Sequence, residues 1–228
     1  MLSLNQQIAN YRPNPKTLAA IARITLVTVI GPAGVGKTTL MEQAARTDKD
    51  IHLVLSDTSR LARPGEANGV SYFFRSREEM FELLNQRAFV QIAPIVSGDL
   101  YGSSPASFGE PGKIAMMAVW SEAMFQFRTL PFHALHPIFI VPPDFKEWQR
   151  RLEVREFSPA VLNNRLAEAK RSFEFALSDD HLNFIINDDL KLALDNFLKL
   201  AHGQVSLAQS ADQARAREII KDILNKLS

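Results

Sequence analysis

The sequence predicts an α/β fold with a mostly parallel central sheet, and three observations lead to this prediction. Short runs of β-branched and other apolar residues recur along the chain, as in strands that are buried on both faces of a parallel sheet. Helical patterns lie between most of these runs. The chain has 228 residues, of which 46% are hydrophobic, so one domain can bury a substantial core. In such folds, ligands gather at the carboxyl ends of the strands.

The predicted strands and helices alternate from residue 24 onward. Strands are predicted at residues 24–30, 51–55, 113–119, 138–141 and 183–186. Helices are predicted at residues 38–46, 121–128, 144–152, 159–177 and 189–201. We expect residues 23–203 to form the main domain, preceded by an N-terminal arm or helix over residues 1–22.

Residues 204–228 are predicted to form an amphipathic C-terminal helix. Apolar residues recur there at helical spacing, at Leu207, Ala211, Ala214, Ile219, Ile223 and Leu227. We favour packing of this helix on the body of the same chain over binding of a partner.

Two stretches depart from the simple alternation of strands and helices. Residues 56–105 contain several turn signals around short strands at 70–74 and 89–95 and one helix at 76–86, which predicts a small inserted lobe. Arginines crowd residues 150–168, and the helical pattern breaks there near Ser158-Pro159. This second stretch is predicted to be a hinged helical lid.

Composition excludes several classes of function. The 26 Lys and Arg nearly balance the 25 Asp and Glu, so no global field gathers nucleic acid or an anionic membrane. Without cysteine there is no disulfide, thiolate metal site or thiol nucleophile. The N-terminus carries no export signal, and Gly or Pro interrupts the longest uncharged stretches. We expect a cytoplasmic monomer or homodimer that binds neither nucleic acid nor membranes.

The most specific motif is a phosphate-binding loop between the first predicted strand and the helix that follows it. Residues 31–39 fit the pattern G-x-x-x-x-G-K-[ST]. Such a loop turns its backbone N–H groups toward phosphate oxygens, and the helix N-terminus adds positive potential. Lys37 is expected to reach the β- and γ-phosphates, and Thr38 to ligate Mg²⁺. The predicted ATP-binding residues of the loop are Gly31, Ala33, Gly34, Val35, Gly36, Lys37, Thr38 and Thr39.

A second phosphate site is predicted in the inserted lobe. Arg60 and Arg63 stand three residues apart in a turn-rich segment, and guanidinium groups pair bidentately with phosphate oxygens. Tyr72 and Tyr101 would add hydroxyl groups. On these residues alone, surface charge on a loop is an equally good explanation.

The order of these motifs resembles the guanylate kinase family from about residue 24 to residue 201. The segment from Ser56 to Phe74, followed by Tyr101-Gly102-Ser103, is similar to that family's S-x-T-T-R-x-P-R-x-G-E-x-x-G-x-x-Y-x-F and Y-G-[ST] patterns. The residues 76–80, Pro142-Pro143 and the residues 187–190 are similar to it as well. The resemblance implies a P-loop NTPase-type three-layer α/β fold. It also implies an enzyme that transfers a phosphoryl group from ATP, with Mg²⁺, to a nucleoside monophosphate, GMP first among the candidates.

The resemblance implies roles for single residues. Lys37, Arg155 and Arg165 are the implied catalytic residues, with Arg151 a weaker third arginine over the phosphates. Asn187 is implied beside the donor nucleotide. The implied acceptor-binding residues are Ser56, Arg60, Arg63, Tyr72, Gln91, Tyr101, Ser103 and Trp120. For Arg150 and Arg171 we prefer ion pairs with Glu147 and Glu168 on a solvated helix face.

The base site departs from the family, which holds the guanine edge with two acids. Gln91 and Trp120 stand at the corresponding positions. Each lost charge-assisted hydrogen bond is worth ~1.5–3 kcal/mol. Gln91 and a stacked Trp120 can still form a purine site, or the acceptor is AMP, a modified nucleotide or a phosphorylated sugar. A third possibility is that Trp120 fills the base pocket and acceptor binding is lost. A separate alternative is a binding module that has kept ATP binding but lost transfer; we favour the kinase.

Overall fold

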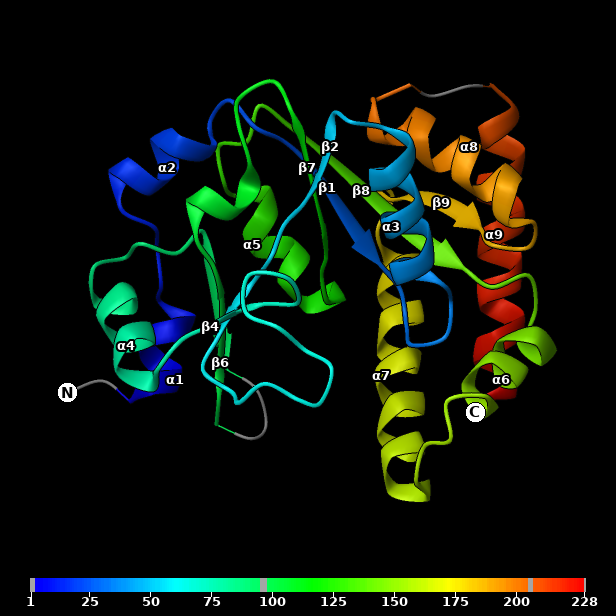
Figure 1. Cartoon of the computed structure of the whole chain (residues 1–228). Helices are drawn as coiled ribbons and strands as arrows, with labels where there is room; N and C mark the ends of the chain where they lie inside the picture. Colours follow the sequence, from blue (N-terminus) through cyan, green and yellow to red (C-terminus); the bar gives the residue numbers. More distant parts are fainter. Residues whose placement is uncertain (1–2, 95–97, 205–206, 228) are drawn as a thin grey trace.

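A five-stranded parallel sheet forms the centre of the molecule (Figure 1). This computed structural model describes residues 3–94, 98–204 and 207–227. The order of the sheet is β2-β7-β1-β8-β9, and each neighbouring pair is parallel. The strands are β1 (Thr25–Ile30), β2 (Ile51–Leu53), β7 (Ile114–Ala118), β8 (Ala134–Val141) and β9 (Asn183–Ile186). The predicted α/β fold is therefore confirmed.

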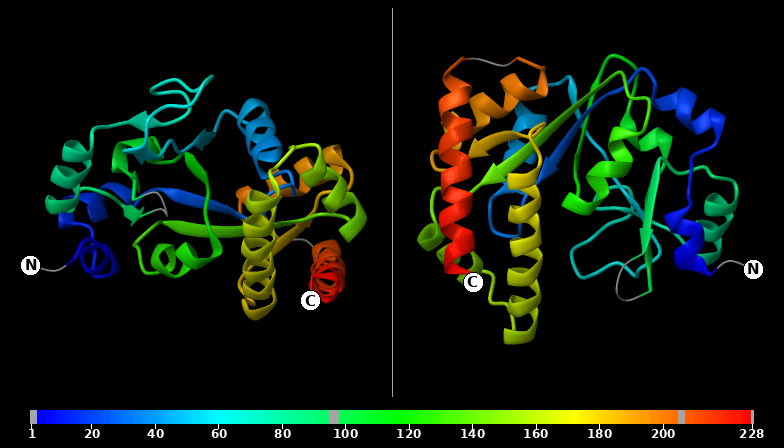
Figure 2. Two further views of the ribbon diagram at one scale, coloured as in Figure 1. Left: turned by 90° about the horizontal axis from the view of Figure 1, so that it is seen from below. Right: turned by 180° about the vertical axis from the view of Figure 1, so that it is seen from behind.

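Helices cover both faces of the central sheet, as the view from below shows (Figure 2). The helix α3 (Lys37–Thr47) lies on one face and packs on α8 (Leu190–Ala201). The helices α7 (Pro159–Ser178) and α9 (Leu207–Lys226) pack together on the opposite face. The central strand β1 is consequently buried on both faces, and Leu26, Val27 and Val29 have no exposed surface.

The remaining short elements connect the sheet to its helices. They are α5 (Met124–Arg128), α6 (Phe145–Glu153) and the 3₁₀ helices η1 (Pro105–Phe108) and η2 (Ser121–Ala123). Within the described residues, no helix is long and apolar enough to cross a membrane.

The inserted lobe, residues 56–105, contains a second sheet of order β4-β3-β6-β5. Its strands are β3 (Asp57–Thr58), β4 (Phe73–Phe74), β5 (Gln91–Pro94) and β6 (Leu100–Ser103), and its helix is α4 (Arg77–Asn85). Met80, Phe89 and Leu100 belong to a small core that is separate from the main one. The strand expected at 70–74 is only two residues long, because residues 69–71 form a turn in which the Val70 and Ser71 N–H groups both donate to the Ala67 carbonyl, at 3.2 and 3.0 Å. The expected strand at 89–95 begins at Gln91, and Ile95 lies outside the described residues.

The N-terminal segment forms two helices, α1 (Leu4–Ala9) and α2 (Pro15–Ile21), which reach different cores. Ile8 is buried in the core of the lobe, whereas Ile21 is fully buried in the main core. Residues 3–22 therefore join the lobe to the body of the molecule.

The C-terminal helix α9 packs on the body, as the sequence predicted, and with part of the predicted face, because Ile219, Ile223 and Leu227 all pack in or against the main core. Ala216, Ile220 and Ile223 are fully buried, whereas Ala214 is exposed. The side chains of Leu207 and Ala211 lie outside the described residues. Polar contacts also hold the helix in this rotation.

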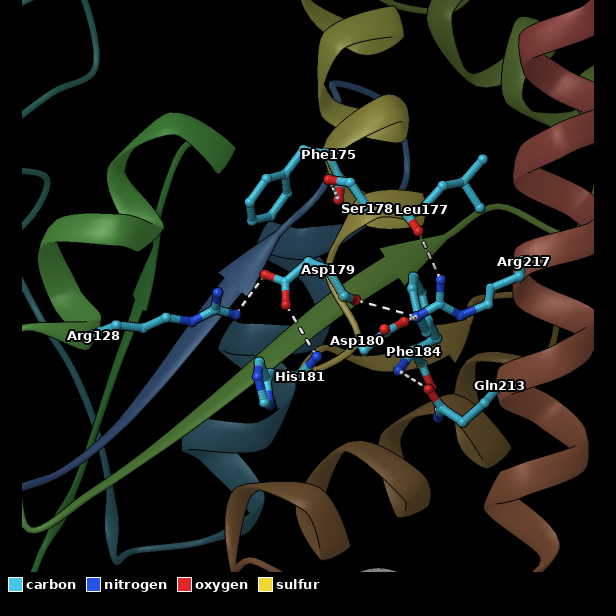
Figure 3. Close-up of polar contacts among 10 residues, drawn as sticks. All are labelled: Arg128, Phe175, Leu177, Ser178, Asp179, Asp180, His181, Phe184, Gln213 and Arg217. Atoms are coloured by element: carbon cyan, nitrogen blue, oxygen red, sulfur yellow. Dashed lines mark hydrogen bonds and ion pairs between the residues drawn. The ribbon is translucent and has the colours of Figure 1, made fainter.

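Two polar side chains on α9 make these contacts (Figure 3). The Gln213 side chain accepts the Phe184 N–H at 2.8 Å and donates to the Phe184 carbonyl at 3.2 Å, on the edge strand β9. Arg217 donates to the carbonyl oxygens of Leu177 and Asp179, where α7 ends. Gln213 therefore caps the open edge of the sheet, and Arg217 ties α9 to the end of α7.

Candidate active site

The phosphate loop, residues 31–36, follows β1 and turns into the N-terminus of α3, as the sequence predicted. Gly36 begins the helix with a φ of 95°, and a Cβ there would lie 2.2 Å from the Asn187 amide nitrogen. A side chain at Gly36 is therefore excluded by both backbone conformation and space. Val35 is fully buried, and Thr38 and Thr39 are exposed in the first turn of α3. Gly31, Ala33 and Gly34 form the remainder of the curve.

The Lys37 ammonium group lies across the phosphate loop. It donates to the carbonyl oxygens of Gly31 at 2.6 Å and Pro32 at 2.8 Å. Burial, followed by the positive charges of Arg155 and Arg165, lowers the pKa of Lys37 from 10.5 to about 8. The structure thus brings the charges of three residues that are far apart in the sequence to one place.

Two side chains from outside the loop hold its backbone. The Trp148 indole N–H on α6 donates to the Ala33 carbonyl at 2.8 Å. The Asn187 amide, at the end of β9, donates to the Val35 carbonyl at 2.8 Å. Asn187 was expected near the donor site, whereas Trp148 was not, because one aromatic residue in an amphipathic helix gives no sequence signal for this contact.

The arginine-rich stretch contains ion pairs that partly differ from those expected. Arg150 pairs with Glu147 at 2.7 Å, as predicted, and Arg151 pairs with Glu147 as well, at 2.8 Å. Arg155 is exposed in the link between α6 and α7.

The expected pair of Arg171 with Glu168 is wrong. Glu168 binds Arg165 at 2.7 Å, and Arg171 approaches Glu122 at 3.6 Å. Both arginines lie three residues from Glu168, so the spacing along the helix does not decide between them. Glu122 lies on η2, which packs against α7, and it provides Arg171 with another partner.

In the lobe, Arg60, Tyr72 and Tyr101 come together. The Arg60 guanidinium donates to the Tyr101 hydroxyl at 2.7 Å and lies 5.0 Å from the centre of the Tyr72 ring. It also forms two hydrogen bonds of 2.6 Å with Glu66, which raise the pKa of Arg60. Arg63 is exposed, and its backbone N–H donates to the same carboxylate at 2.8 Å. Glu66 is part of the lobe motif, but no role was predicted for it.

The residues expected around the acceptor base come from both sheets. Gln91 on β5 lies opposite Ser103 on β6 in the lobe sheet. The Ser103 hydroxyl is buried and has no hydrogen-bond partner within the described residues. The Ser56 carbonyl accepts the Phe73 N–H at 3.0 Å at the start of the lobe.

Trp120 follows β7 of the central sheet, and 64% of its surface is exposed. The side chain is therefore not enclosed in a pocket in this structure.

A loop with this lysine, placed after the central strand of a parallel sheet, defines a P-loop protein that binds a nucleoside triphosphate. The comparisons with known proteins specify the class further. The sequence model of the guanylate kinase family matches residues 23–201. A guanylate kinase from Hahella chejuensis is 34% identical over 213 residues, which cover 91% of this chain and 100% of the relative. One from Nostoc sp. is 35% identical over 173 residues, covering 74% of this chain and 85% of the relative.

Solved structures agree on the fold. The crystal structure of guanylate kinase from Anaplasma phagocytophilum matches with a TM-score of 0.59 at 23% identity. The match covers 82% of this chain and 88% of that one. The chain therefore belongs to the guanylate kinase family, and it is a nucleoside monophosphate kinase.

Proposed function

We propose that the enzyme transfers the γ-phosphoryl group of ATP to GMP, giving ADP and GDP. An oxygen of the acceptor phosphate forms the new bond to the γ-phosphorus, and the bond from that phosphorus to the bridging oxygen of ADP breaks. The observation that carries the proposal is the combination, in one member of this family, of two clusters of side chains suited to bind phosphate. One is the loop around Lys37, and the other is the cluster of Arg60, Tyr72 and Tyr101 in the lobe.

The donor site would hold the triphosphate through the N–H groups of the loop and through Lys37. Arg155 and Arg165 would neutralise charge on the moving phosphoryl group, because phosphoryl transfer depends mainly on positioning and electrostatic stabilisation. Their effect on the pKa of Lys37 supports this role. Asn187 would keep the loop in shape through its bond to the Val35 carbonyl.

The residues of the donor site fit a magnesium ion bound together with ATP. The Thr38 hydroxyl is an exposed oxygen beside Lys37 and makes no hydrogen bond within the described residues. The described residues contain no cluster of three metal-binding side chains. This fits Mg²⁺, which binds through one or two protein oxygens, substrate phosphates and water. The ion would add positive charge at the β- and γ-phosphates.

The acceptor site would use Arg60, Arg63, Tyr72 and Tyr101 for the monophosphate. Arg63 is exposed and can turn toward an anion, since its side chain makes no hydrogen bond or ion pair within the described residues, although its charge acts on Glu66. The base of the acceptor would be surrounded by Ser56, Gln91, Ser103 and Trp120. The Gln91 amide can both donate and accept hydrogen bonds, so it can serve guanine without a carboxylate.

ADP release from ATP and Mg²⁺ with GMP, dGMP, AMP, CMP or UMP tests the proposal. We expect GMP to give the highest rate, and Lys37→Ala to lower kcat by roughly 10²–10³-fold while the protein stays folded. A folded Lys37→Ala variant with near-native kcat contradicts the proposed mechanism. If the protein binds ATP but releases no ADP with any acceptor, the proposed function is wrong. If another acceptor gives ADP release and GMP does not, the enzyme is a kinase for that acceptor.

A further inference from the structure

The helix α6 packs directly against the apex of the phosphate loop. The Trp148 side chain is 1% exposed, and its indole N–H donates to the Ala33 carbonyl at 2.8 Å. A Cβ on Gly34 would lie 3.0 Å from Leu152 and 3.4 Å from Trp148, so these two side chains touch the backbone of the loop. One face of α6 thus forms the wall behind residues 33 and 34.

This contact fixes the direction of one peptide group. In a trans peptide, the carbonyl and the N–H of the next residue point in opposite directions. The structure contains no cis peptide bond within the described residues. Because Trp148 holds the Ala33 carbonyl toward α6, the Gly34 N–H points away from α6, to the opposite side of the loop backbone.

A second contact acts in the same way two residues later. Asn187 holds the Val35 carbonyl, so the Gly36 N–H is directed away from Asn187. Two alternate peptide groups of the loop are therefore fixed by side chains from α6 and from the end of β9. A phosphate-binding loop needs its N–H groups held toward the anion before the anion arrives, since turning them afterwards costs part of the binding free energy.

We propose that Trp148 is a positioning residue for the donor phosphates, acting through the Ala33-Gly34 peptide group. The inference rests on the proposed function, because that function makes the loop an ATP site. Trp148 also lies on α6, the helix that leads into the predicted lid at residues 150–168. Its contact with Ala33 therefore joins the phosphate loop to the start of the lid.

The test compares Trp148→Phe with Phe145→Leu in the full-length protein. Phe keeps an aromatic ring but has no N–H donor. Phe145 contacts the Trp148 ring edge-on, with centroids 6.1 Å apart, so its substitution by Leu disturbs packing at Trp148 and leaves the hydrogen bond in place. Kd values for ATP and for GMP are measured by calorimetry without turnover, alongside unfolding.

We expect Trp148→Phe to raise the Kd of ATP about three- to tenfold and to leave the Kd of GMP unchanged. Phe145→Leu should lower the free energy of unfolding without raising the Kd of ATP. The proposal is overturned if folded Trp148→Phe has an unchanged Kd for ATP. It is also overturned if both variants raise the Kd for ATP by the same factor. If the wild-type protein binds ATP but does not phosphorylate GMP, the proposed function fails, and the Kd values still decide the role of Trp148.

If Trp148→Phe does not fold, the wild-type protein supplies the answer through its two tryptophans. The indole N–H of Trp148 should exchange slowly with solvent, unlike that of the exposed Trp120. Its NMR signal should shift when ATP is added and stay in place when GMP alone is added. A Trp148 signal that does not respond to ATP overturns the proposal.

Discussion

At the scale of single residues, Lys37 lies where its own charge is disfavoured. Burial and two arginines lower its pKa to about 8, so the amino group of Lys37 is only partly protonated at slightly alkaline pH. A bound triphosphate reverses this balance, because an opposite charge stabilises the protonated form. The pKa of Lys37 should therefore rise when ATP binds.

This change predicts proton uptake on ATP binding near pH 8. We expect roughly half a proton per site, because a group with a pKa of about 8 is half protonated there and becomes fully protonated in the complex. The affinity for ATP should fall as the pH rises above about 8. Calorimetry in two buffers with different ionisation enthalpies measures the uptake. Lys37→Arg, which keeps the charge but does not titrate in this range, is the control, and equal uptake by both proteins contradicts the assignment.

The second prediction at this scale concerns Gln91 and Trp120. Combining Gln91→Glu with Trp120→Asp should raise kcat/KM for GMP relative to AMP by roughly tenfold or more, because carboxylates accept from the guanine N1–H and N2–H. Steady-state kinetics with both acceptors measure the ratio. Gln86→Glu makes the same amide-to-acid change on the exposed end of α4 and should leave the ratio unchanged. A flat ratio in the double variant shows that these positions do not contact the base.

At the scale of elements, the predictions were most accurate where the determinants are local. The strand β1, the phosphate loop and α3 lie within a residue or two of their predicted bounds, since an apolar β-branched run, glycines and a helical pattern follow each other directly. The length of β4 was overestimated because the N–H groups of Val70 and Ser71 bond to the Ala67 carbonyl in a turn and not to a neighbouring strand. The buried face of α9 was predicted only in part. Ile223 is buried as expected, but Ala216 and Ile220 were not predicted, because contacts with β9 and α7, which depend on the fold, also set the rotation of the helix.

The contact between α9 and the end of α7 gives the prediction at this scale. Arg217 donates to the Leu177 carbonyl at 3.0 Å and to the Asp179 carbonyl at 3.1 Å, and it lies over the Phe184 ring at 5.1 Å (Figure 3). The last carbonyl groups of a helix have no partner within the helix, so Arg217 satisfies groups that otherwise need water.

Arg217→Ala should lower the free energy of unfolding by about 1–3 kcal/mol, with an unchanged slope in urea. Hydrogen exchange near residues 177–180 should become faster, because the end of α7 loses its cap. Arg215→Ala removes an exposed arginine of the same helix and is the matched control. If the two variants are equally stable, the contacts of Arg217 with the end of α7 do not stabilise the fold.

At the scale of the whole molecule, the substrates would meet between parts that the sequence separates. The phosphate loop lies at the end of the central sheet, with the lobe on one side and α6 and α7 on the other (Figures 1 and 2). The motifs pointed to both clusters of residues that we propose to bind phosphate. They did not reveal the contacts of Glu66 with Arg60 or of Trp148 with Ala33, because a motif records which residues recur and gives no information on which neighbour orients them.

The N-terminal segment adds a second connection between the lobe and the body. The Tyr11 hydroxyl donates to the Phe89 carbonyl at 2.7 Å and accepts the Phe89 N–H at 2.8 Å, while α2 is anchored in the main core. Burial raises the pKa of Tyr11 to about 12. A raised pKa means that the folded state favours the protonated hydroxyl. Its contribution to stability is therefore complete below about pH 10 and is lost as the pH rises through about 12.

Tyr11→Phe should detach this connection without unfolding the body. The variant keeps the ring but leaves both backbone groups of Phe89 unpaired, at a cost of about 1–3 kcal/mol. At neutral pH, hydrogen exchange should become faster in α1 and at Phe89 and stay unchanged in β1, which is the internal control. The difference in unfolding free energy between the two proteins should shrink between pH 10 and 12, because only the wild type loses a proton there. Unchanged exchange in α1 would mean that apolar packing around Ile8, and not the hydroxyl, holds the segment on the lobe.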